Sequence, residues 1–327
     1  MNGVKGVLVL LYALAALSAG AQVRIQDSGD IIGAVKDDGI WEQKEPRWHG
    51  SVSLKGHEGH SFFMRRIQFD TGMVSYSLVY NFCVDPSHKG SRLIPFSTGL
   101  GMDMPVQQNW ACQNFFDVLI DGQSIGDTKA SFAVSGSGKE SARIEISWQN
   151  ENASVTLIFA PESQEIRLPV TLTIVPRKEL KSIQVCLRCY PNEYAAPWNL
   201  GQSVRNRHIA TAKRDEGVLG TEPTKTIKLG AGEPWIVYYD ANLDKGVTRT
   251  LSDGKSQRTG AGPCAMAYIS AETREVTVNL GGYNIDTFLS YPPATREIHL
   301  LLWDFGAGKG EKNNKETLDY FKSLEVE

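Results

Sequence analysis

Apolar side chains recur at every second position along most of this chain. Between residues 74 and 82 they occupy the even positions, and the odd positions between them are mostly small or polar. Successive side chains of an extended strand point to opposite faces, so this spacing predicts a strand with one buried face. The same pattern recurs at 144–148, 155–159, 166–174 and 183–189. Further strands are expected at 61–70, 115–120, 235–240, 264–269, 275–280 and 296–305.

Short turn sequences separate these runs. Asp38-Gly39, Asp121-Gly122 and Asp253-Gly254 carry the strongest short hairpin signal, and Gln149–Asn152 links two alternating runs. Gly136–Gly138 is expected to form another turn. Because almost no helical spacing lies between the strands, the sequence predicts an all-β fold, a large antiparallel β-sandwich.

One helix is expected, close to the C-terminus at about residues 313–325. Asn313 to Glu316 matches a capping box, and Leu318, Phe321 and Leu324 follow at helical spacing. We expect residues 22–327 to form a single large β-sandwich domain that carries this helix at its edge.

The first 21 residues have the layout of a secretory signal peptide. Lys5 precedes an apolar stretch from Val7 to Leu17, and Ala19–Ala21 supplies an A-x-A cleavage signal. That stretch is too short for a good membrane span, and no later segment is long and apolar enough to be one. We therefore expect cleavage after Ala21 and a secreted or periplasmic mature protein without a membrane span.

Charge and location narrow the expected partners and cofactors. The formal net charge is −3 at pH 7. Nucleic-acid binding depends on clustered positive charge, and Lys and Arg form no long run here, so nucleic acid is not an expected partner. Export also argues against nucleotide-driven chemistry and cytosolic redox cofactors, so no cofactor is expected.

The cysteines and histidines give no convincing metal site. Cys186 and Cys189 have a C-x-x-C spacing, but on the expected strand they point to opposite faces, which disfavours a mutual bond or a shared metal. His57 and His60 are one residue short of the His-Glu-x-x-His spacing of helical zinc sites. A Cys83–Cys112 disulfide stays open as an alternative to unpaired thiols.

Three long stretches interrupt the strand pattern, at 85–114, 191–207 and 240–262, and long loops on a compact scaffold often carry function. Sugar recognition combines an aromatic face for the C–H surface of the ring with planar polar groups for the hydroxyls. The candidate ligand-binding residues with this mixture are Asp103, Gln107, Gln108, Asn109, Trp110, Trp198 and Asn199. The alternative is that Trp110 plugs the sandwich and the amides are solvated.

The second stretch and the residue that follows it, His208, supply the best candidates for catalysis. A polysaccharide lyase needs a group that neutralises a uronate carboxylate, a base for the C5 proton and an acid for the leaving oxygen. Arg205, His208 and Tyr194 supply these side-chain types. The alternative is an exposed polar strand edge on which His208 has no special role. A glycosidase would instead use two carboxylates, and the sequence leaves open which pair converges.

In strand number, length, export signal and loop composition, the chain resembles the galactose mutarotase-like β-supersandwich over about residues 29–305. That fold is a large two-sheet antiparallel domain of aldose epimerases and of several polysaccharide lyases and glycosidases. Aldose epimerases carry a characteristic His and Glu pair, to which His208 and Glu233 correspond by chain order only. The resemblance therefore implies a carbohydrate-binding role and does not extend to epimerase activity.

The sequence thus predicts a secreted or periplasmic β-sandwich protein that binds carbohydrate, in particular polysaccharide, through its two Trp-bearing loops. Two alternatives stay open. One is a polysaccharide lyase or glycoside hydrolase that works in the same groove. The other is a cell-surface structural or assembly module, which would present a large exposed apolar patch instead of a polar groove.

Overall fold

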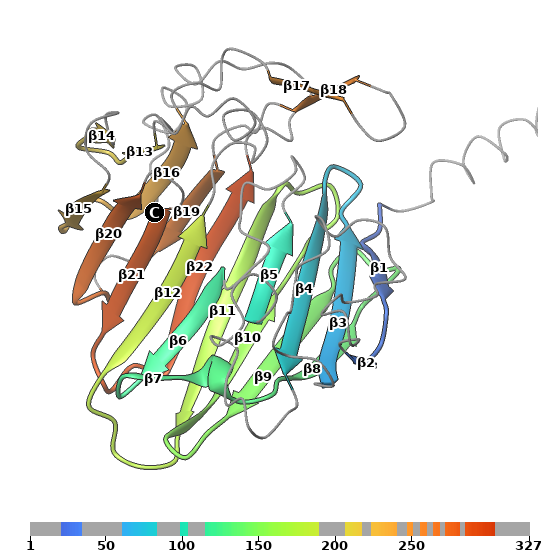
Figure 1. Cartoon of the computed structure of the whole chain (residues 1–327), viewed down its shortest axis with the longest axis horizontal. Coiled ribbons are helices and arrows are strands. Elements are labelled where there is room, and N and C mark those ends of the chain that lie inside the picture. The colour runs from blue at the N-terminus through green and yellow to red at the C-terminus, as the bar shows by residue number, and fades with distance from the viewer. Residues whose placement is uncertain are drawn as a thin grey trace, which may run out of the picture.

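A computed structural model describes residues 21–34, 61–83, 99–103, 115–189, 207–217, 224–240, 247–250, 256–259, 264–268, 272–281 and 285–304. Within these ranges almost all of the regular structure is antiparallel strand, arranged as two large facing sheets (Figure 1). This confirms the all-β sandwich that the alternating pattern predicts. The expected signal peptide and the expected C-terminal helix at 313–325 lie outside the described residues, apart from Ala21.

The first sheet contains eleven strands among the described residues. Its main path is, in spatial order, β1 (Arg24–Asp27), β3 (Ser61–Asp70), β4 (Ser75–Cys83), β5 (Gly99–Asp103), β6 (Phe116–Ile120), β12 (Ile183–Cys189), β21 (Ile285–Tyr291), β20 (Glu275–Gly281) and β15 (Thr224–Leu229). Off this path, β2 (Ile31–Ala34) pairs with β3, and β7 (Gln123–Ser124) pairs with β6. A short 3-10 helix, η1 (Ile125–Asp127), follows β7.

The second sheet contains nine strands in the described part of the chain. Their spatial order is β14 (Asp215–Gly217), β13 (Arg207–Ala210), β16 (Trp235–Asp240), β19 (Cys264–Tyr268), β22 (Glu297–Asp304), β11 (Arg167–Pro176), β10 (Ala153–Phe159), β9 (Arg143–Gln149) and β8 (Ser131–Ser135). A separate pair consists of β17 (Val247–Thr250) and β18 (Ser256–Thr259). This pair flanks Asp253-Gly254, a predicted hairpin turn that itself lies outside the described residues.

Burial follows the predicted alternation strand by strand. In β12 the residues from Ile183 to Cys189 alternate between buried and half-buried, so Cys189 faces the core and Cys186 faces outward. The opposite-face prediction for this C-x-x-C pair is therefore confirmed. The inward side chains of both sheets join one continuous cluster of buried apolar residues. Tyr238 of β16 also reaches across the sandwich, where its Oη lies 2.9 Å from Oγ1 of Thr287 on β21.

The turn chemistry is confirmed where the structure describes it. Asp121 and Gly122 join β6 to β7 with φ of 53° and 78°, the pair of left-handed residues that a tight hairpin turn requires. Gly136 follows β8 with φ of 80°, and a Cβ added there would lie 2.6 Å from the carbonyl oxygen of Ser141. In the β9–β10 hairpin, the backbone N–H groups of Asn152 and Ala153 donate to Asn150 Oδ1.

Asn152 begins an Asn-Ala-Ser sequence of the type that receives N-linked glycans. The residue is only 1% exposed. Its Nδ2 donates to the carbonyl oxygen of Ile120 at 3.3 Å and to Oε1 of Gln123 at 2.8 Å. The amide therefore ties the β9–β10 hairpin to the β6–β7 hairpin and is not accessible for modification in the folded protein.

The structure corrects two stretches that were expected to interrupt the strand pattern. The stretch 240–262 contains the paired strands β17 and β18. The stretch 85–114 was expected to lack strand structure, but β5 divides it at Gly99–Asp103. Leu100 and Met102 of this strand are buried, and glycines alternate with them. Glycine is a poor strand former, which hid this alternation. Among the described residues, no helical segment has the length and apolar character of a membrane span.

Candidate functional site

Strand ends from both sheets meet at one edge of the sandwich. In the first sheet β5 ends at Asp103, β6 begins at Phe116 and β12 ends at Cys189, and the pairing registers place these three ends together. In the second sheet β13 begins at Arg207, opposite Asp240, the last residue of β16. The C-terminal ends of β12, β16 and β22, drawn as arrowheads, all lie at this edge, which is uppermost in Figure 1. We call it the shared edge.

The shared edge anchors the second part of the stretch 85–114, together with the stretches that follow β12 and β16. Segment 104–114 connects Asp103 to Phe115, segment 190–206 connects Cys189 to Arg207, and segment 241–246 follows Asp240. Among the predicted ligand-binding residues, Asp103 ends β5 at this edge. Gln107, Gln108, Asn109, Trp110, Trp198 and Asn199 lie outside the described residues, as do Tyr194 and Arg205.

An ion pair lies on the outer face of the first sheet at the shared edge. Arg188 Nε of β12 is 2.7 Å from Asp286 Oδ1 of β21. The Arg188 side chain is 38% exposed, so solvent screens the pair and its contribution to stability is small. The Arg188 backbone N–H donates to the carbonyl oxygen of Phe115, the residue at which segment 104–114 rejoins the sheet. A charged pair is therefore placed beside the base of that segment.

His208 is the predicted catalytic residue whose side chain the structure describes. It lies on β13, one residue from the shared edge, with its side chain 19% exposed. Its Nδ1 is 3.6 Å from Oδ1 of Asp215 on β14. The ring covers Gly217, where an added Cβ would lie 2.3 Å from Cε1 and 2.4 Å from Nε2. At this distance the two side chains are too far apart for a hydrogen bond, and they form an ion pair only when the imidazole is protonated.

Glu233, the counterpart of His208 by chain order in the epimerase resemblance, is fully engaged elsewhere. Its carboxylate is 1% exposed and accepts four hydrogen bonds from three residues. Thr211 Oγ1 donates at 2.7 Å, Arg214 Nε at 2.8 Å and the Gly230 backbone N–H at 2.9 Å. Burial acts to raise the pKa of Glu233, but these bonds outweigh it and hold the pKa below its ordinary value. This carboxylate stabilises the turn between β13 and β14.

Sequence reasoning missed the Arg188–Asp286 pair. Both residues occupy outward positions of alternating strands, a place that sequence reasoning treats as solvated surface. Nothing local indicates that β12 and β21 are neighbours, because 95 residues separate the end of one from the start of the other. Among the described residues, no group of three or more His, Cys, Asp or Glu side chains is arranged to hold a metal ion.

No protein-family model matches this chain, and no curated protein matches it. Solved structures with similarity to it include a candidate aldose 1-epimerase from Klebsiella pneumoniae, with a TM-score of 0.44 and 8% identity over 90% of this chain and 94% of the other. A GH36 α-galactosidase from Geobacillus stearothermophilus in complex with raffinose has a TM-score of 0.37 and 10% identity, over 73% of this chain and 40% of the other. The galactosidase domain of an α-galactosidase–sucrose kinase has a TM-score of 0.35 and 13% identity, over 74% of this chain and 40% of the other.

This chain spans only 40% of the two galactosidase chains. At TM-scores this low, neither the activity nor the site residues of those proteins can be transferred to this chain.

Proposed function

We propose that this chain is a secreted or periplasmic β-sandwich protein that binds carbohydrate, in particular polysaccharide, at the shared edge. The observation that supports this most is the common anchoring of segments 104–114 and 190–206 on neighbouring strands of one sheet. Each segment contains a Trp flanked by amides, Trp110 with Gln108 and Asn109, and Trp198 with Asn199. Two segments that begin at one edge, each with a Trp ring for stacking and planar amides for hydrogen bonding, suit the binding of several linked sugar units.

Two features of the described scaffold favour this edge over a flat binding face. The strands below it are held by a continuous buried core, so segments anchored there have a rigid base. The ion pair Arg188–Asp286 adds charged hydrogen-bonding groups on the outer face of the same sheet, within reach of polar ligand groups. The large apolar side chains that are exposed among the described residues are Met73, in the turn between β3 and β4, and Val175 on β11; two separate residues count against an extended apolar assembly surface on this part of the chain.

The second candidate function is a polysaccharide lyase or glycoside hydrolase at the same edge. The observation that favours it is the His208–Asp215 pair, which places a carboxylate 3.6 Å from a half-buried imidazole, one residue from the shared edge. In this function His208 would exchange a proton with the sugar, and Arg205 and Tyr194 would supply the charge-neutralising group and the acid.

The test is a panel of acidic and neutral polysaccharides, presented to purified residues 22–327, with binding and product release measured in the same wells. Variants Trp110→Ala and Trp198→Ala probe the two segments, and Val175→Ala is the matched control. Val175 is also apolar and exposed, but it lies on β11 at the opposite edge of the sandwich. We expect binding that each Trp variant weakens at least tenfold and that Val175→Ala leaves unchanged.

The outcomes separate the candidate functions. Product release that His208→Ala abolishes would support the enzyme, and release that persists in this variant would remove His208 from the mechanism. Binding that both Trp variants retain would refute the proposed site, and no binding to any polysaccharide would refute carbohydrate recognition and favour the structural module. Export is tested separately by N-terminal sequencing of the mature protein, which should begin at Gln22.

A further inference from the structure

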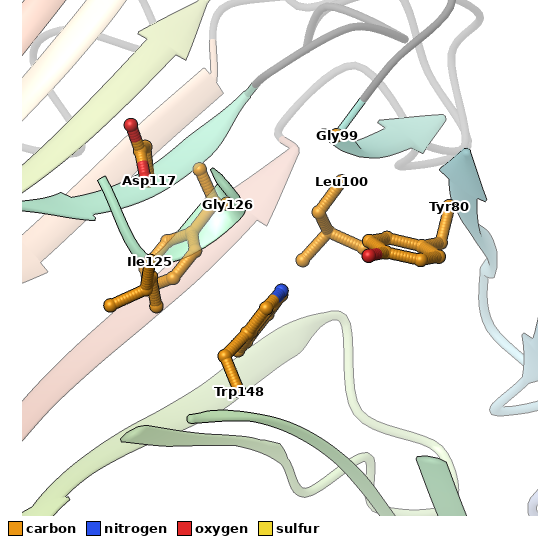
Figure 2. Close-up of a pocket in the computed structure, with 8 residues that line it drawn as sticks. Tyr80, Gly99, Leu100, Asp117, Ile125, Gly126 and Trp148 are labelled. Carbon is orange, nitrogen blue, oxygen red and sulfur yellow. The ribbon is translucent and has the colours of Figure 1, made fainter. Parts of the chain in front are cut away.

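A small hollow lies where β5 and η1 approach the same side of β6. The other side of β6 pairs with β12, so β5 and β7 share the remaining side. β5 pairs with β6 at a single position, Leu100 with Phe116, and β7 pairs only near the far end of β6. The strand ladder is therefore interrupted between them, beside Asp117. The hollow is lined by Tyr80, Gly99, Leu100, Phe116, Asp117, Ile125, Gly126 and Trp148 (Figure 2).

Trp148 forms the floor of this hollow from the opposite sheet. The residue lies on β9 and is 4% exposed. Its Nε1 is buried and has no partner of good hydrogen-bond geometry among the described residues, although the indole lies close enough to the Tyr80 hydroxyl to act to lower the pKa of Tyr80. Figure 2 shows the indole nitrogen pointing into the hollow, toward Leu100 and Tyr80. A buried N–H without a partner costs about 1–3 kcal/mol, so a native protein is expected to satisfy it.

The polar groups around the hollow favour a neutral oxygen as its occupant. The indole N–H needs an acceptor, which excludes a cation. The carboxylate of Asp117 at the wall, within hydrogen-bonding distance of Ser124 Oγ, disfavours an anion. The Tyr80 hydroxyl accepts the backbone N–H of Ala130 at 2.8 Å, and burial raises its pKa, so this hydroxyl keeps its proton at neutral pH.

Size limits the occupant further. The cavity volume is about 10 Å³, which is room for roughly one water molecule. Ordered water molecules bind buried polar groups in cavities of this kind and connect elements that do not contact each other directly. A sugar ring does not fit, although a single hydroxyl group does.

We propose that this hollow binds one hydroxyl oxygen, supplied by a water molecule or a small alcohol, which accepts a hydrogen bond from Trp148 Nε1–H and links the two sheets. The occupant lies where the ladder along β6 is interrupted between β5 and β7. It thereby supports β5, the strand that ends at Asp103 on the shared edge. The site does not depend on carbohydrate binding, because its lining residues belong to the described scaffold.

A high-resolution crystal structure of residues 22–327 tests this site, with a second crystal soaked in methanol. We expect density for one oxygen at 2.7–3.2 Å from Trp148 Nε1, an ordinary N–H···O distance. Oxygen density alone identifies water, and added carbon density after soaking identifies a site open to alcohols; either result supports the proposal. An empty hollow, or an indole that bonds a protein group instead, overturns it.

A solution measurement checks the same point. In protein labelled with ¹⁵N-Trp, the indole proton of Trp148 should show a direct nuclear Overhauser effect with a long-lived water, and Trp148→Phe assigns this signal by its loss. Trp235→Phe is the matched control, since Trp235 is equally buried on β16 and should leave the water signal in place. Absence of a water contact at Trp148 in the folded wild-type protein overturns the proposal.

Discussion

Replacing Glu233 with Ala tests whether the turn between β13 and β14 depends on one buried carboxylate. The substitution removes an acceptor that takes four hydrogen bonds, two of them from Arg214. Arg214 also lies 3.2 Å from Glu216, and its side chain is 35% exposed, so it can regain water after the loss. Thr211 is fully buried with Glu233 and has less access to solvent, whereas Gly230 is exposed.

The size of the effect follows from these contacts. Removing one partner of a buried ion pair costs about 3–5 kcal/mol, and hydrogen bonds to charged groups contribute about 1.5–3 kcal/mol each. Because Arg214 can be rehydrated, we take the lower end and expect the free energy of unfolding to fall by about 3 kcal/mol. Glu233→Gln keeps the shape but offers one acceptor oxygen to four donor contacts, so we expect a loss of about 2 kcal/mol.

The pH dependence supplies a second signature. The pKa of Glu233 in the folded protein lies below the ordinary value of about 4.3, so the folded state favours the charged form. Its stabilisation is therefore complete above the unfolded pKa and is lost as pH falls through the folded pKa. Glu233→Gln does not titrate. The stability difference between wild type and this variant should be constant above about pH 5 and shrink at lower pH.

The assay is urea unfolding followed by circular dichroism, at pH 7 and at steps down to the acid limit of folding. Glu151→Ala is the control, because that side chain is 71% exposed and lies 3.9 Å from Lys178. It should change the free energy of unfolding by no more than about 0.5 kcal/mol. If Glu233→Ala costs as little as the control, or if the Gln variant keeps the same deficit at low pH, the reasoning is refuted.

Three further substitutions test other parts of the scaffold by the same unfolding assay. Asn152→Ala should lower the free energy of unfolding by about 2 kcal/mol, because two hydrogen bonds are lost. Mass spectrometry of protein from a glycosylating host should show that Asn152 is unmodified, and a glycan there would contradict its burial. Gly136→Ala should lower the free energy of unfolding by more than about 1 kcal/mol, because φ is 80° and the carbonyl of Ser141 blocks the added Cβ. Gly230→Ala has open space around the added Cβ and should cost less, so equal costs would contradict this reasoning. Tyr238→Phe should cost about 1 kcal/mol through the lost bond to Thr287, and no loss would show that this bond is unimportant.

The sequence predicts strands well where burial alternates cleanly, and poorly where a polar or small residue occupies an inward position. The strand predicted at 61–70 matches β3, and 235–240 matches β16. β21 was missed because Thr287 interrupts its inward apolar series. That threonine is buried because Tyr238 supplies its hydrogen bond from the other sheet, and no local pattern shows such a partner.

The candidate site likewise has features that the sequence shows and features that only the strand pairing shows. Long polar stretches with Trp are visible in the sequence, and so is His208, because they depend on residue type and spacing. Their common anchoring depends on which strands pair, and β6 pairs with β12 across 62 intervening residues. Asp215 beside His208 and the hollow at Trp148 arise likewise from strand pairing and from the unequal reach of β5 and β7 along β6. Sequence therefore indicates which segments can bind, whereas the registers determine which of them start from one edge, and that geometry is what makes a joint binding site testable.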